Sequence, residues 1–334
     1  MEKIKVTSKI VAEKAGVSRS AVSRCFTPGA VISSKTREKV LIVAKELGYQ
    51  PNALARTLIN GRSKIIGLVV GYFSNPFYPK AVELLSNQLS EKGYHVLLFF
   101  SSSESNEAII DQMTQYQCDA AILMSTTLSS TLNDSLNQHQ IPTILFNRID
   151  SFGSRSSVTA DNFNGGFAIG NYLIGRGSER IMYVAGLAES STNHERRAGF
   201  LKALKEHDHK LFLEVPGDYN DSKAADLVKR VFLNSDSSPD AIFVANDHMA
   251  YAIMDMLRYD LKMKIPDDIL VVGFDDAPPS SWPSYSLTTY SQPLQPMVTA
   301  TIDLVLSAIS KSRSSLENLK IPGRLIVRDS TKRG

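Results

Sequence analysis

The fold of the N-terminal part is decided by residues 7–25, whose sequence is TSKIVAEKAGVSRSAVSRC. Its apolar side chains recur at helical spacing, and three positions stand out, Ala12, Gly16 and Val22. Two helices that cross steeply need a small side chain at their contact, a turn residue that tolerates positive φ, and an apolar anchor in the second helix. The spacing therefore predicts a helix-turn-helix. The alternative is an ordinary helical hairpin whose arginines are merely solvated.

Three short helices are expected in this region. The first begins near Thr7-Ser8, the second spans Ser18–Cys25, and the third begins near Ser33-Ser34 and ends at Gly48. With Val22 buried, four polar side chains of the second helix face outward: Arg19, Ser20, Ser23 and Arg24. An arginine there can donate two hydrogen bonds to guanine O6 and N7, and the start of such a helix reaches base edges in the major groove.

Charge is distributed unevenly along the chain. Residues 1–64 carry thirteen Lys or Arg and four Glu, a net charge of +9, whereas the remaining residues carry a net charge of −6. A small basic head on a mildly acidic body is expected where only the head meets a polyanion. Basic surfaces are common, so this charge favours nucleic-acid binding only together with the helix spacing.

Residues 51–63, PNALARTLINGRS, have the start and stop signals of a short helix, a proline at the beginning and Gly61 near the end. A helix this short becomes ordered only when something packs on it. Leu54 and Leu58 lie on one face, so two copies in a dimer could meet there and insert a leucine into the minor groove. A linker helix docked on the body fits the spacing equally well.

From Lys64 onward, apolar runs alternate with amphipathic helical stretches. The expected strands are Ile65–Gly71, Tyr94–Phe100, Ala120–Met124, Thr143–Phe146, Arg180–Ala185, Leu211–Val215, Ala241–Ala245 and Ile269–Phe274. The expected helices include Pro79–Lys92, Asn162–Gly175, Glu195–Glu206, Asp221–Leu233 and Asp247–Tyr259. Such alternation indicates parallel sheets covered on both faces, and the quieter stretch at 150–157 suggests two α/β subdomains.

Polar and aromatic residues recur where these strands end, which is where open α/β sheets bind ligands. They are Ser74-Asn75, Phe77-Tyr78, Asn147-Arg148, Asp161, Asn246-Asp247 and Asp275-Asp276. Carboxylates and amides can hold neighbouring hydroxyl groups, and aromatic rings can cover an apolar sugar or base face. Each residue alone is more commonly a helix cap, and we expect Asn162 and Asp247 to be caps.

Several classes of protein are excluded by composition and motifs. The 334 residues, 43% hydrophobic and 21% charged, fill about two domains. No apolar run approaches the roughly 20 residues that span a bilayer, and the first residues carry no apolar signal core, which favours a cytoplasmic protein without membrane contact. Two cysteines make no disulfide framework, and the six histidines form no metal-ligand pattern. No nucleotide-binding or nucleophile motif is present, so we expect no enzyme activity and no cofactor.

The chain resembles the lactose/galactose repressor family of bacterial transcription regulators over nearly its full length. In the head the resemblance rests on VAEKAGVS (11–18), AVSR (21–24) and LGYQPNALARTL (47–58). In the body it rests on IGLVV (66–70), SNPFY (74–78), DN (161–162), RRAGF (196–200), VAND (244–247), VGFDD (272–276) and LTT (287–289). Together these motifs are highly specific.

The resemblance implies an α/β protein with an all-α helix-turn-helix headpiece and a body like that of periplasmic sugar-binding proteins. That body would consist of two doubly wound parallel-sheet subdomains joined by three crossover strands, and two chains would form a homodimer. The implied domains are 1–50 for DNA binding, 51–63 for a hinge helix, and 64–334 for effector binding and dimerisation. The subdomains would comprise roughly 64–161 with 291–319, and 162–290 with 320–330.

The resemblance also implies site residues. Leu58 would be the minor-groove wedge, with Asn52 and Ala55 as further DNA contacts of the hinge helix. The implied effector contacts are Asn75, Phe77, Asn147, Asp161, Arg196, Asn246 and Asp275. Arg196 and Asp275 would bind adjacent hydroxyls from opposite sides of the cleft. Ser190 stands where relatives that bind a purine corepressor have an arginine, which weighs against a purine.

Two functions of different kinds follow from these observations. The first is a sequence-specific DNA-binding repressor, whose affinity for double-stranded operator DNA is controlled by a small-molecule effector, a sugar or sugar derivative. The alternative is a cytoplasmic sugar-binding protein with a degenerate head and no DNA function.

Overall fold

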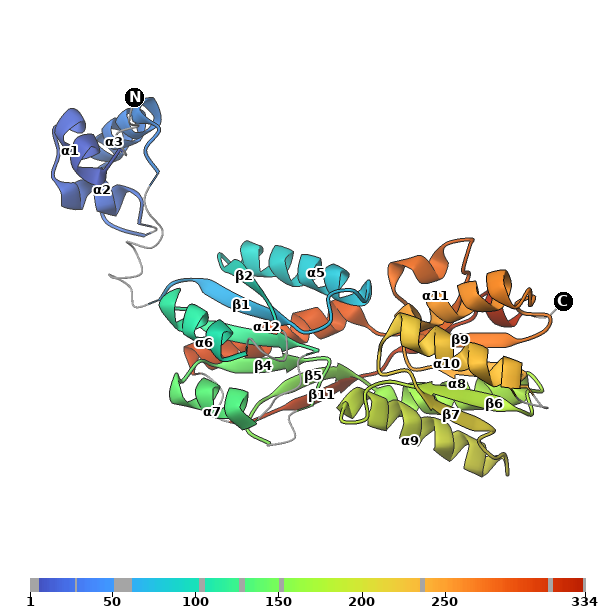
Figure 1. Cartoon of the computed structure of the whole chain (residues 1–334). Coiled ribbons are helices and arrows are strands. Elements are labelled where there is room, and N and C mark those ends of the chain that lie inside the picture. Colours follow the sequence, from blue (N-terminus) through green and yellow to red (C-terminus); the bar gives the residue numbers. More distant parts are fainter. Residues whose placement is uncertain are drawn as a thin grey trace. The chain divides into compact units, whose positions relative to one another are not determined.

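The computed structural model describes residues 6–27, 29–50, 62–101, 106–125, 130–149, 153–234, 238–311 and 315–332. The chain divides into two compact units, Met1–Ser63 and Lys64–Gly334, called here the headpiece and the body (Figure 1). Residues 51–61 of the expected hinge helix 51–63, among them Asn52, Ala55 and Leu58, lie outside the described residues.

The described part of the headpiece contains three helices, α1 (Ser8–Ala15), α2 (Arg19–Cys25) and α3 (Ser34–Leu47). One fully buried valine from each helix forms its core: Val11, Val22 and Val40. Gly16 has φ +62°, so it makes the left-handed turn between α1 and α2 that the spacing predicts. The Ser18 hydroxyl accepts a hydrogen bond from the Ala21 amide and caps α2, whereas the Thr7 side chain makes no capping bond to α1.

The body contains two six-stranded sheets. The first has the strand order β11-β5-β4-β3-β1-β2 and the second has β12-β10-β9-β8-β6-β7. The strands of the first sheet are β1 (Ile65–Val70), β2 (His95–Phe100), β3 (Ala120–Met124), β4 (Thr143–Phe146), β5 (Ser157–Ala160) and β11 (Asn318–Ile321). Those of the second are β6 (Ile181–Ala185), β7 (Leu213–Pro216), β8 (Ala241–Val244), β9 (Leu270–Asp275), β10 (Thr288–Ser291) and β12 (Arg324–Ile326). All their pairings are parallel except that of β12, which runs antiparallel to β10 at the sheet edge.

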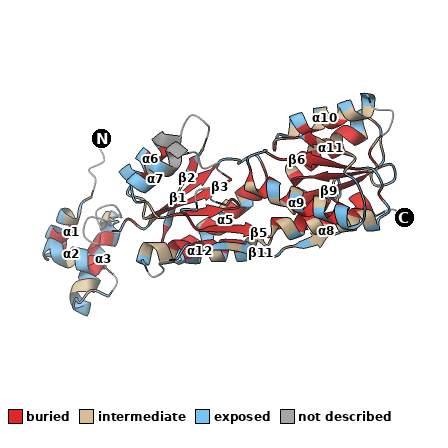
Figure 2. Cartoon of the chain, turned by 90° about the horizontal axis from the view of Figure 1, so that it is seen from below, coloured by how far each residue is buried: buried red, intermediate tan, exposed pale blue. Residues whose placement is uncertain are grey.

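The first lobe is the first sheet with helices on both faces (Figure 1). Helices α5 (Phe77–Glu91) and α12 (Leu294–Ser310) cover one face, while α6 (Asn106–Gln115) and α7 (Ser130–Gln138) cover the other. Successive side chains of a strand point to opposite faces of the sheet. In β1, Leu68 packs in the cluster with α5 and α12, and Val69 packs in the cluster with α6 and α7. The strands are therefore largely buried between exposed helix faces (Figure 2).

The second lobe is built in the same way. Its helices are α8 (Asn162–Gly175), α9 (Ser191–Glu206), α10 (Asp221–Asn234) and α11 (Asp247–Asp255), with π-helical residues Met256–Asp260 continuing α11. Short 3₁₀ turns follow at Pro278–Ser281 and Asp329–Thr331. Helices α8 and α9 pack closely against each other, and so do α10 and α11. Tyr183, Phe200 and Phe243 lie fully buried at the centre of this lobe.

The chain passes between the lobes three times, from β5 to α8, from β10 to α12, and from β11 to β12. Two of these passages differ slightly from the expected boundaries. Strand β11 pairs with β5 up to Ile321, so the last passage follows Ile321 rather than residue 319. Ser291, expected in the first lobe, pairs with Asp275 as the last residue of β10. The boundaries differ because main-chain hydrogen bonds continue to the last residues of a strand. The apolar residues by which a strand is recognised in the sequence lie only in its middle.

Candidate functional site

The exposed face of α2 carries the polar residues expected to meet DNA. Arg19, Ser20, Ser23 and Arg24 are all exposed, while Val22 and Cys25 on the opposite side are buried. The Ser20 hydroxyl lies 2.9 Å from that of Ser18, at the start of the helix. Within the described part of the chain neither arginine is paired with a carboxylate. Both guanidinium groups are therefore available to an anionic partner.

Arg37 of α3 supports this face, and sequence reasoning missed it. Its guanidinium donates to the carbonyl oxygens of Cys25 at 3.0 Å and Ala30 at 3.4 Å. The Cys25 thiol donates in return to the Arg37 carbonyl at 3.6 Å. These bonds tie the C-terminal end of α2 to α3, so the orientation of the exposed face depends on a charged side chain that does not belong to it.

A second candidate site lies in the body, between the two lobes and at the carboxyl ends of their strands. The first lobe contributes its residues after β1 and β4, and the second lobe those of α9 and those after β7, β8 and at the end of β9. The lining residues are Tyr72, Asn75, Tyr78, Asn147, Arg148, Thr192, Arg196, Tyr219, Asn246 and Asp275. We call this the cleft. The cleft contains five of the expected effector contacts. Arg196 lies on a helix, and the other four lie at or after strand ends: Asn75, Asn147, Asn246 and Asp275.

The Asp275 carboxylate has three polar partners in and around the cleft. One carboxylate oxygen accepts a hydrogen bond from the Gln292 amide at 2.6 Å and lies 3.6 Å from the Arg196 guanidinium. The other accepts from the Asn75 amide at 3.0 Å. Burial raises the pKa of Asp275, and the Arg196 guanidinium opposes that rise. Its φ of +134° and that of Asp276 at +57° are strained for non-glycine residues, as is common where a backbone is bent to present side chains to a ligand.

Arg196 is 2% exposed and is held on every side. Its Nε donates to the Asn162 side chain at 2.8 Å, and its Nη1 donates to the Ala245 carbonyl oxygen. The guanidinium also lies 3.7 Å over the Phe274 ring. Arg196 and Asp275 both belong to the second lobe and pair with each other, so the expectation that they face each other across the cleft is wrong. The residue that meets Asp275 from the first lobe is Asn75.

The two lobes are joined across the cleft by several hydrogen bonds. Besides Asn75 and Asp275, the Arg148 guanidinium donates to the Thr192 hydroxyl at 2.8 Å. The Tyr72 hydroxyl lies 2.6 Å from His248 Nδ1. The space left between the lining side chains is about 10 Å³, room for a single water molecule. A ligand of sugar size therefore requires the lobes to move apart.

Two of the expected effector contacts do not line the cleft. Phe77 is buried in the first lobe, where its ring stacks on Phe146 at 6.4 Å. Asp161 caps α8, accepting from the Asn164 amide at 3.1 Å. The expected caps Asn162 and Asp247 are wrong by one residue, because the preceding residues Asp161 and Asn246 accept the capping hydrogen bonds. Where two polar residues follow each other at the start of a helix, the sequence does not show which of them is the N-cap.

Asn246 is both a helix cap and a residue of the cleft. Its side-chain oxygen accepts from the Met249 amide at 3.0 Å and caps α11, while the residue also lines the cleft. Sequence reasoning missed Tyr72, Thr192 and Tyr219 as lining residues. Tyr72 comes two residues after β1 and Tyr219 three residues after β7, so both lie at strand ends, where a signal was available. Thr192 lies in the first turn of α9, where neither the strand-end pattern nor the family resemblance pointed to it.

Asp247 lies behind the cleft and is fully buried. One of its oxygens accepts from the Ala277 amide at 2.9 Å and the Ser280 hydroxyl at 2.7 Å, and the other accepts from the Thr289 hydroxyl at 2.6 Å. Burial, together with the neighbouring Asp275 carboxyl, raises the pKa of Asp247 to about 7. The folded protein therefore holds a proton here that the unfolded chain releases near pH 4.

We expect Asp247→Asn to remove a pH dependence of stability. As the pH rises from about 4 to 7, only the unfolded chain loses this proton, so the free energy of unfolding of the unmodified protein falls by up to about 1.4 kcal/mol per pH unit. The stabilising proton is present at low pH and lost near pH 7. Asparagine can donate to Thr289 and still accept from Ala277, so the variant should lack this fall. Urea unfolding between pH 5 and 8 measures the difference, with the exposed Asp226→Asn as control. Parallel curves for Asp247→Asn and the unmodified protein would contradict the assignment.

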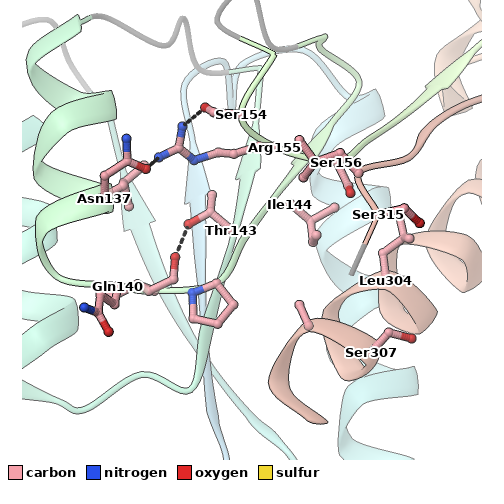
Figure 3. A pocket seen from close by; sticks show the side chains of 15 residues that line it. Asn137, Gln140, Thr143, Ile144, Ser154, Arg155, Ser156, Leu304, Ser307 and Ser315 are labelled. Atoms are coloured by element: carbon pink, nitrogen blue, oxygen red, sulfur yellow. Dashed lines mark hydrogen bonds between the residues drawn. The ribbon is translucent and has the colours of Figure 1, made fainter. Parts of the chain in front are cut away.

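A larger cavity, of about 340 Å³, lies in the first lobe away from the cleft (Figure 3). It is bounded by α7, β4, the 154–156 segment and the end of α12. The Arg155 guanidinium donates to Ser154 Oγ and to Asn137 Oδ1, both at 2.8 Å. None of the expected effector contacts lines this cavity.

In the described residues no group of three or more histidine, cysteine, aspartate or glutamate side chains could hold a metal ion. Over the same residues no helix has the length and apolar character needed to cross a membrane.

Comparisons with known proteins agree with this architecture. Residues 9–52 match the family described as bacterial regulatory proteins, lacI family, and residues 171–331 match a periplasmic binding protein-like domain. The chain is 30% identical to the HTH-type transcriptional repressor PurR of Erwinia tasmaniensis, over 98% of this chain and 97% of that protein. It is 31% identical to the HTH-type transcriptional regulator RegA of Clostridium saccharobutylicum, over 97% of this chain and 98% of that protein.

Solved structures show the same similarity. A lac repressor dimer bound to operator and the anti-inducer ONPF is 26% identical, with a TM-score of 0.87 over 98% of this chain and 99% of that chain. A complex of the transcriptional regulator CelR with cellobiose is 27% identical, with a TM-score of 0.74 over 97% of this chain and 99% of that chain. A helix-turn-helix headpiece and a two-lobed binding body in one chain define a ligand-controlled transcription regulator. The chain belongs to the lacI family of bacterial regulatory proteins, and it is a transcriptional regulator and not an enzyme.

Proposed function

We propose that this regulator is a cytoplasmic homodimer that represses transcription by binding a pseudo-palindromic operator. The observation that carries the proposal is the exposed face of α2, whose Arg19 and Arg24 have no carboxylate partner in the described headpiece. In a helix-turn-helix the corresponding helix lies in the major groove, and two copies read two half-sites. Asn52, Ala55 and Leu58 are proposed to contact the minor groove between them.

The first lobe has a surface suited to a second copy of the chain. Strand β2 is the last strand of its sheet, so among the described residues no strand pairs with one of its edges. Leu98 and Phe100 of this strand are exposed, and the Phe100 ring meets that of Phe73 edge-on at 5.1 Å. An apolar patch on an edge strand favours association, and the lac repressor structure described above is a dimer.

The cleft is proposed to bind the effector, a sugar or sugar derivative. Its amides, hydroxyls, guanidinium groups and single carboxylate suit a polyhydroxyl ring, and its tyrosine rings suit the apolar face of a sugar. Asn75, Asn147, Arg196, Asn246 and Asp275 are the proposed contacts. Phe77 and Asp161 act indirectly, Phe77 by supporting Tyr78 at 5.3 Å and Asp161 by starting α8.

Control of DNA binding follows from the way the cleft is closed. Hydrogen bonds such as that from Asn75 to Asp275 hold the lobes together, and an effector that replaces them changes how the lobes are arranged. The change in operator affinity is limited by the effector's difference in affinity for the two arrangements, typically about 1–3 kcal/mol.

The DNA-binding proposal is tested by operator titrations of the full-length protein. Its affinity for a selected operator should fall steeply with salt, because several phosphates are neutralised. We expect Arg24→Ala to weaken binding by about 1–3 kcal/mol and to relax base preference at one position per half-site. Arg230→Ala, an exposed arginine on α10, is the matched control and should change neither value.

The alternative, a sugar-binding protein without DNA function, makes the opposite prediction. It requires the same weak affinity for every duplex offered, and full function after removal of residues 1–60. The intact core of the described headpiece and its exposed arginines argue against a degenerate head.

A further inference from the structure

Arg148 is a buried cation that has no carboxylate partner among the described residues. It follows β4 at the edge of the cleft and is 7% exposed. Its guanidinium donates only to neutral oxygens: the Asn147 carbonyl at 3.0 Å, the Thr192 hydroxyl at 2.8 Å and the Ser125 hydroxyl at 3.1 Å. Its Nε is buried without any hydrogen-bond partner. The guanidinium also lies 5.8 Å over the Tyr219 ring, and its charge lowers the pKa of the Asp275 carboxyl, but it makes no ion pair with that carboxyl. Burying a cation without a paired carboxylate is costly, so such an arrangement points to a function.

The one carboxylate that lines the cleft is already engaged. Both oxygens of Asp275 are occupied, by Arg196 and Gln292 on one and by Asn75 on the other. The cleft lining thus contains two guanidinium groups and one carboxyl group. The Asp247 carboxyl behind it carries only part of a negative charge near neutral pH, because burial raises its pKa to about 7. The lining therefore has an excess of positive charge, centred on Arg148.

Arg148 also faces the beginning of a long helix. Thr192, which accepts its hydrogen bond, is the second residue of α9, and the Ser190 hydroxyl caps that helix. The first-turn amides of a helix have no acceptors within the helix, and its N-terminus carries a partial positive charge. A cation and a helix N-terminus repel each other across the cleft, and an anion between them would be attracted by both.

The polar atoms near Arg148 indicate which other group the ligand carries besides its anionic group. The side-chain oxygen of Asn147 is buried without a donor, although its amide group donates to the Tyr78 hydroxyl at 3.2 Å. The Tyr219 hydroxyl lies 3.2 Å from that of Thr192. An unsatisfied acceptor on Asn147 and an unsatisfied guanidinium Nε on the next residue fit a ligand that carries both a hydroxyl group and an anionic group.

We propose that the effector is an anionic carbohydrate, a sugar phosphate or a sugar acid, whose anionic group is bound by Arg148 and the first turn of α9. This inference rests on the proposed effector function of the cleft. The anion replaces the hydroxyls of Thr192 and Ser125 as the partner of the guanidinium, in two parallel charge-assisted hydrogen bonds. A neutral sugar leaves Arg148 without a counter-charge, so we expect it to bind more weakly than its anionic derivative.

The test uses inorganic phosphate and acetate as probes of the full-length protein. The melting temperature is recorded against phosphate concentration, with chloride at equal ionic strength as reference. We expect phosphate or acetate to raise the melting temperature by a few degrees, and the rise should saturate, because an anion that binds only the folded state stabilises it. In Arg148→Gln the apparent Kd should rise at least tenfold, while Arg148→Lys should keep part of the response. Arg230→Gln, an exposed arginine elsewhere in the body, should respond as the unmodified protein does.

The two anions distinguish the two classes of ligand. A stronger response to phosphate assigns a sugar phosphate, and a stronger response to acetate assigns a sugar acid. Titration calorimetry with glucose, glucose 6-phosphate and gluconate then compares one carbon skeleton with and without charge. The proposal is overturned if neither anion stabilises the protein, if Arg148→Gln responds as the unmodified protein does, or if the neutral sugar binds more tightly than both derivatives. Failure of the DNA-binding proposal is seen separately, in operator titrations that involve no probe anion.

Discussion

Gly199→Ala should destabilise the second lobe by more than about 3 kcal/mol, because α8 and α9 contact each other through their main chains. A Cβ atom at Gly199 would lie 1.9 Å from the Phe163 carbonyl oxygen, and one at Gly166 would lie 2.0 Å from the Arg196 carbonyl oxygen. Both obstacles are backbone atoms within helices, which cannot turn aside as a flexible side chain can. The helices must separate, and the shift would carry Arg196 away from Asp275.

Gly175→Ala is the matched control, since Gly175 ends the same helix α8 and a Cβ atom there meets nothing within 4 Å. Alanine in its place should leave stability unchanged or raise it by up to about 1 kcal/mol, because alanine loses less backbone entropy on folding. Urea unfolding followed by circular dichroism measures both variants. A Gly199→Ala protein as stable as the unmodified one would show that the two helices can move apart at little cost.

Arg196→Met should destabilise the body by about 3–5 kcal/mol at neutral pH, since it leaves the Asp275 carboxylate buried without its charge partner. Methionine fills a similar volume but cannot donate to Asn162 or to the Ala245 carbonyl oxygen. Without the guanidinium, burial raises the pKa of Asp275 further, so the loss of stability should shrink as the pH falls and the carboxyl becomes protonated. Thermal or urea unfolding between pH 5 and 8 measures this dependence.

The adjacent arginine provides the control for this variant. Arg197 pairs with Glu214 at 2.8 Å, but its side chain is 42% exposed, so Arg197→Met should cost no more than about 1 kcal/mol. The double variant Arg196→Met with Asp275→Asn should regain most of the lost stability, because no buried charge then remains unpaired. If the double variant is as unstable as Arg196→Met alone, the loss comes from packing and not from the Asp275 charge.

Local features of the headpiece and the strands could be predicted from the sequence. The turn at Gly16 and the core position of Val22 depend on neighbours only a few residues away, and both are as expected. Strands such as β3 and β8 are buried along their whole length and read as continuous apolar runs. Helix α7, SerThrLeuAsnAspSerLeuAsnGln over 130–138, was not predicted, because its composition is largely polar and resembles that of a loop.

The cleft could be predicted only in part. Asn75, Asn246 and Asp275 were expected at strand ends from the sequence pattern and Arg196 from the family resemblance, and all four line the cleft. Their pairing could not be read from the sequence, because it depends on how α9 crosses the end of β9. The expectation that Arg196 and Asp275 lie on opposite sides of the cleft was wrong for that reason.

The order of the strands has a consequence for how the protein is made. The first sheet ends with β11 and is covered by α12, both synthesised long after the rest of that lobe. The headpiece is therefore complete early in synthesis. At that stage α12 has not been made, so Leu68 and the other residues that pack under it are still exposed. A nascent chain interrupted after β10 would carry the DNA-reading helices on a body that exposes an apolar sheet. Exposed apolar surface makes such a fragment prone to aggregation and dependent on chaperones.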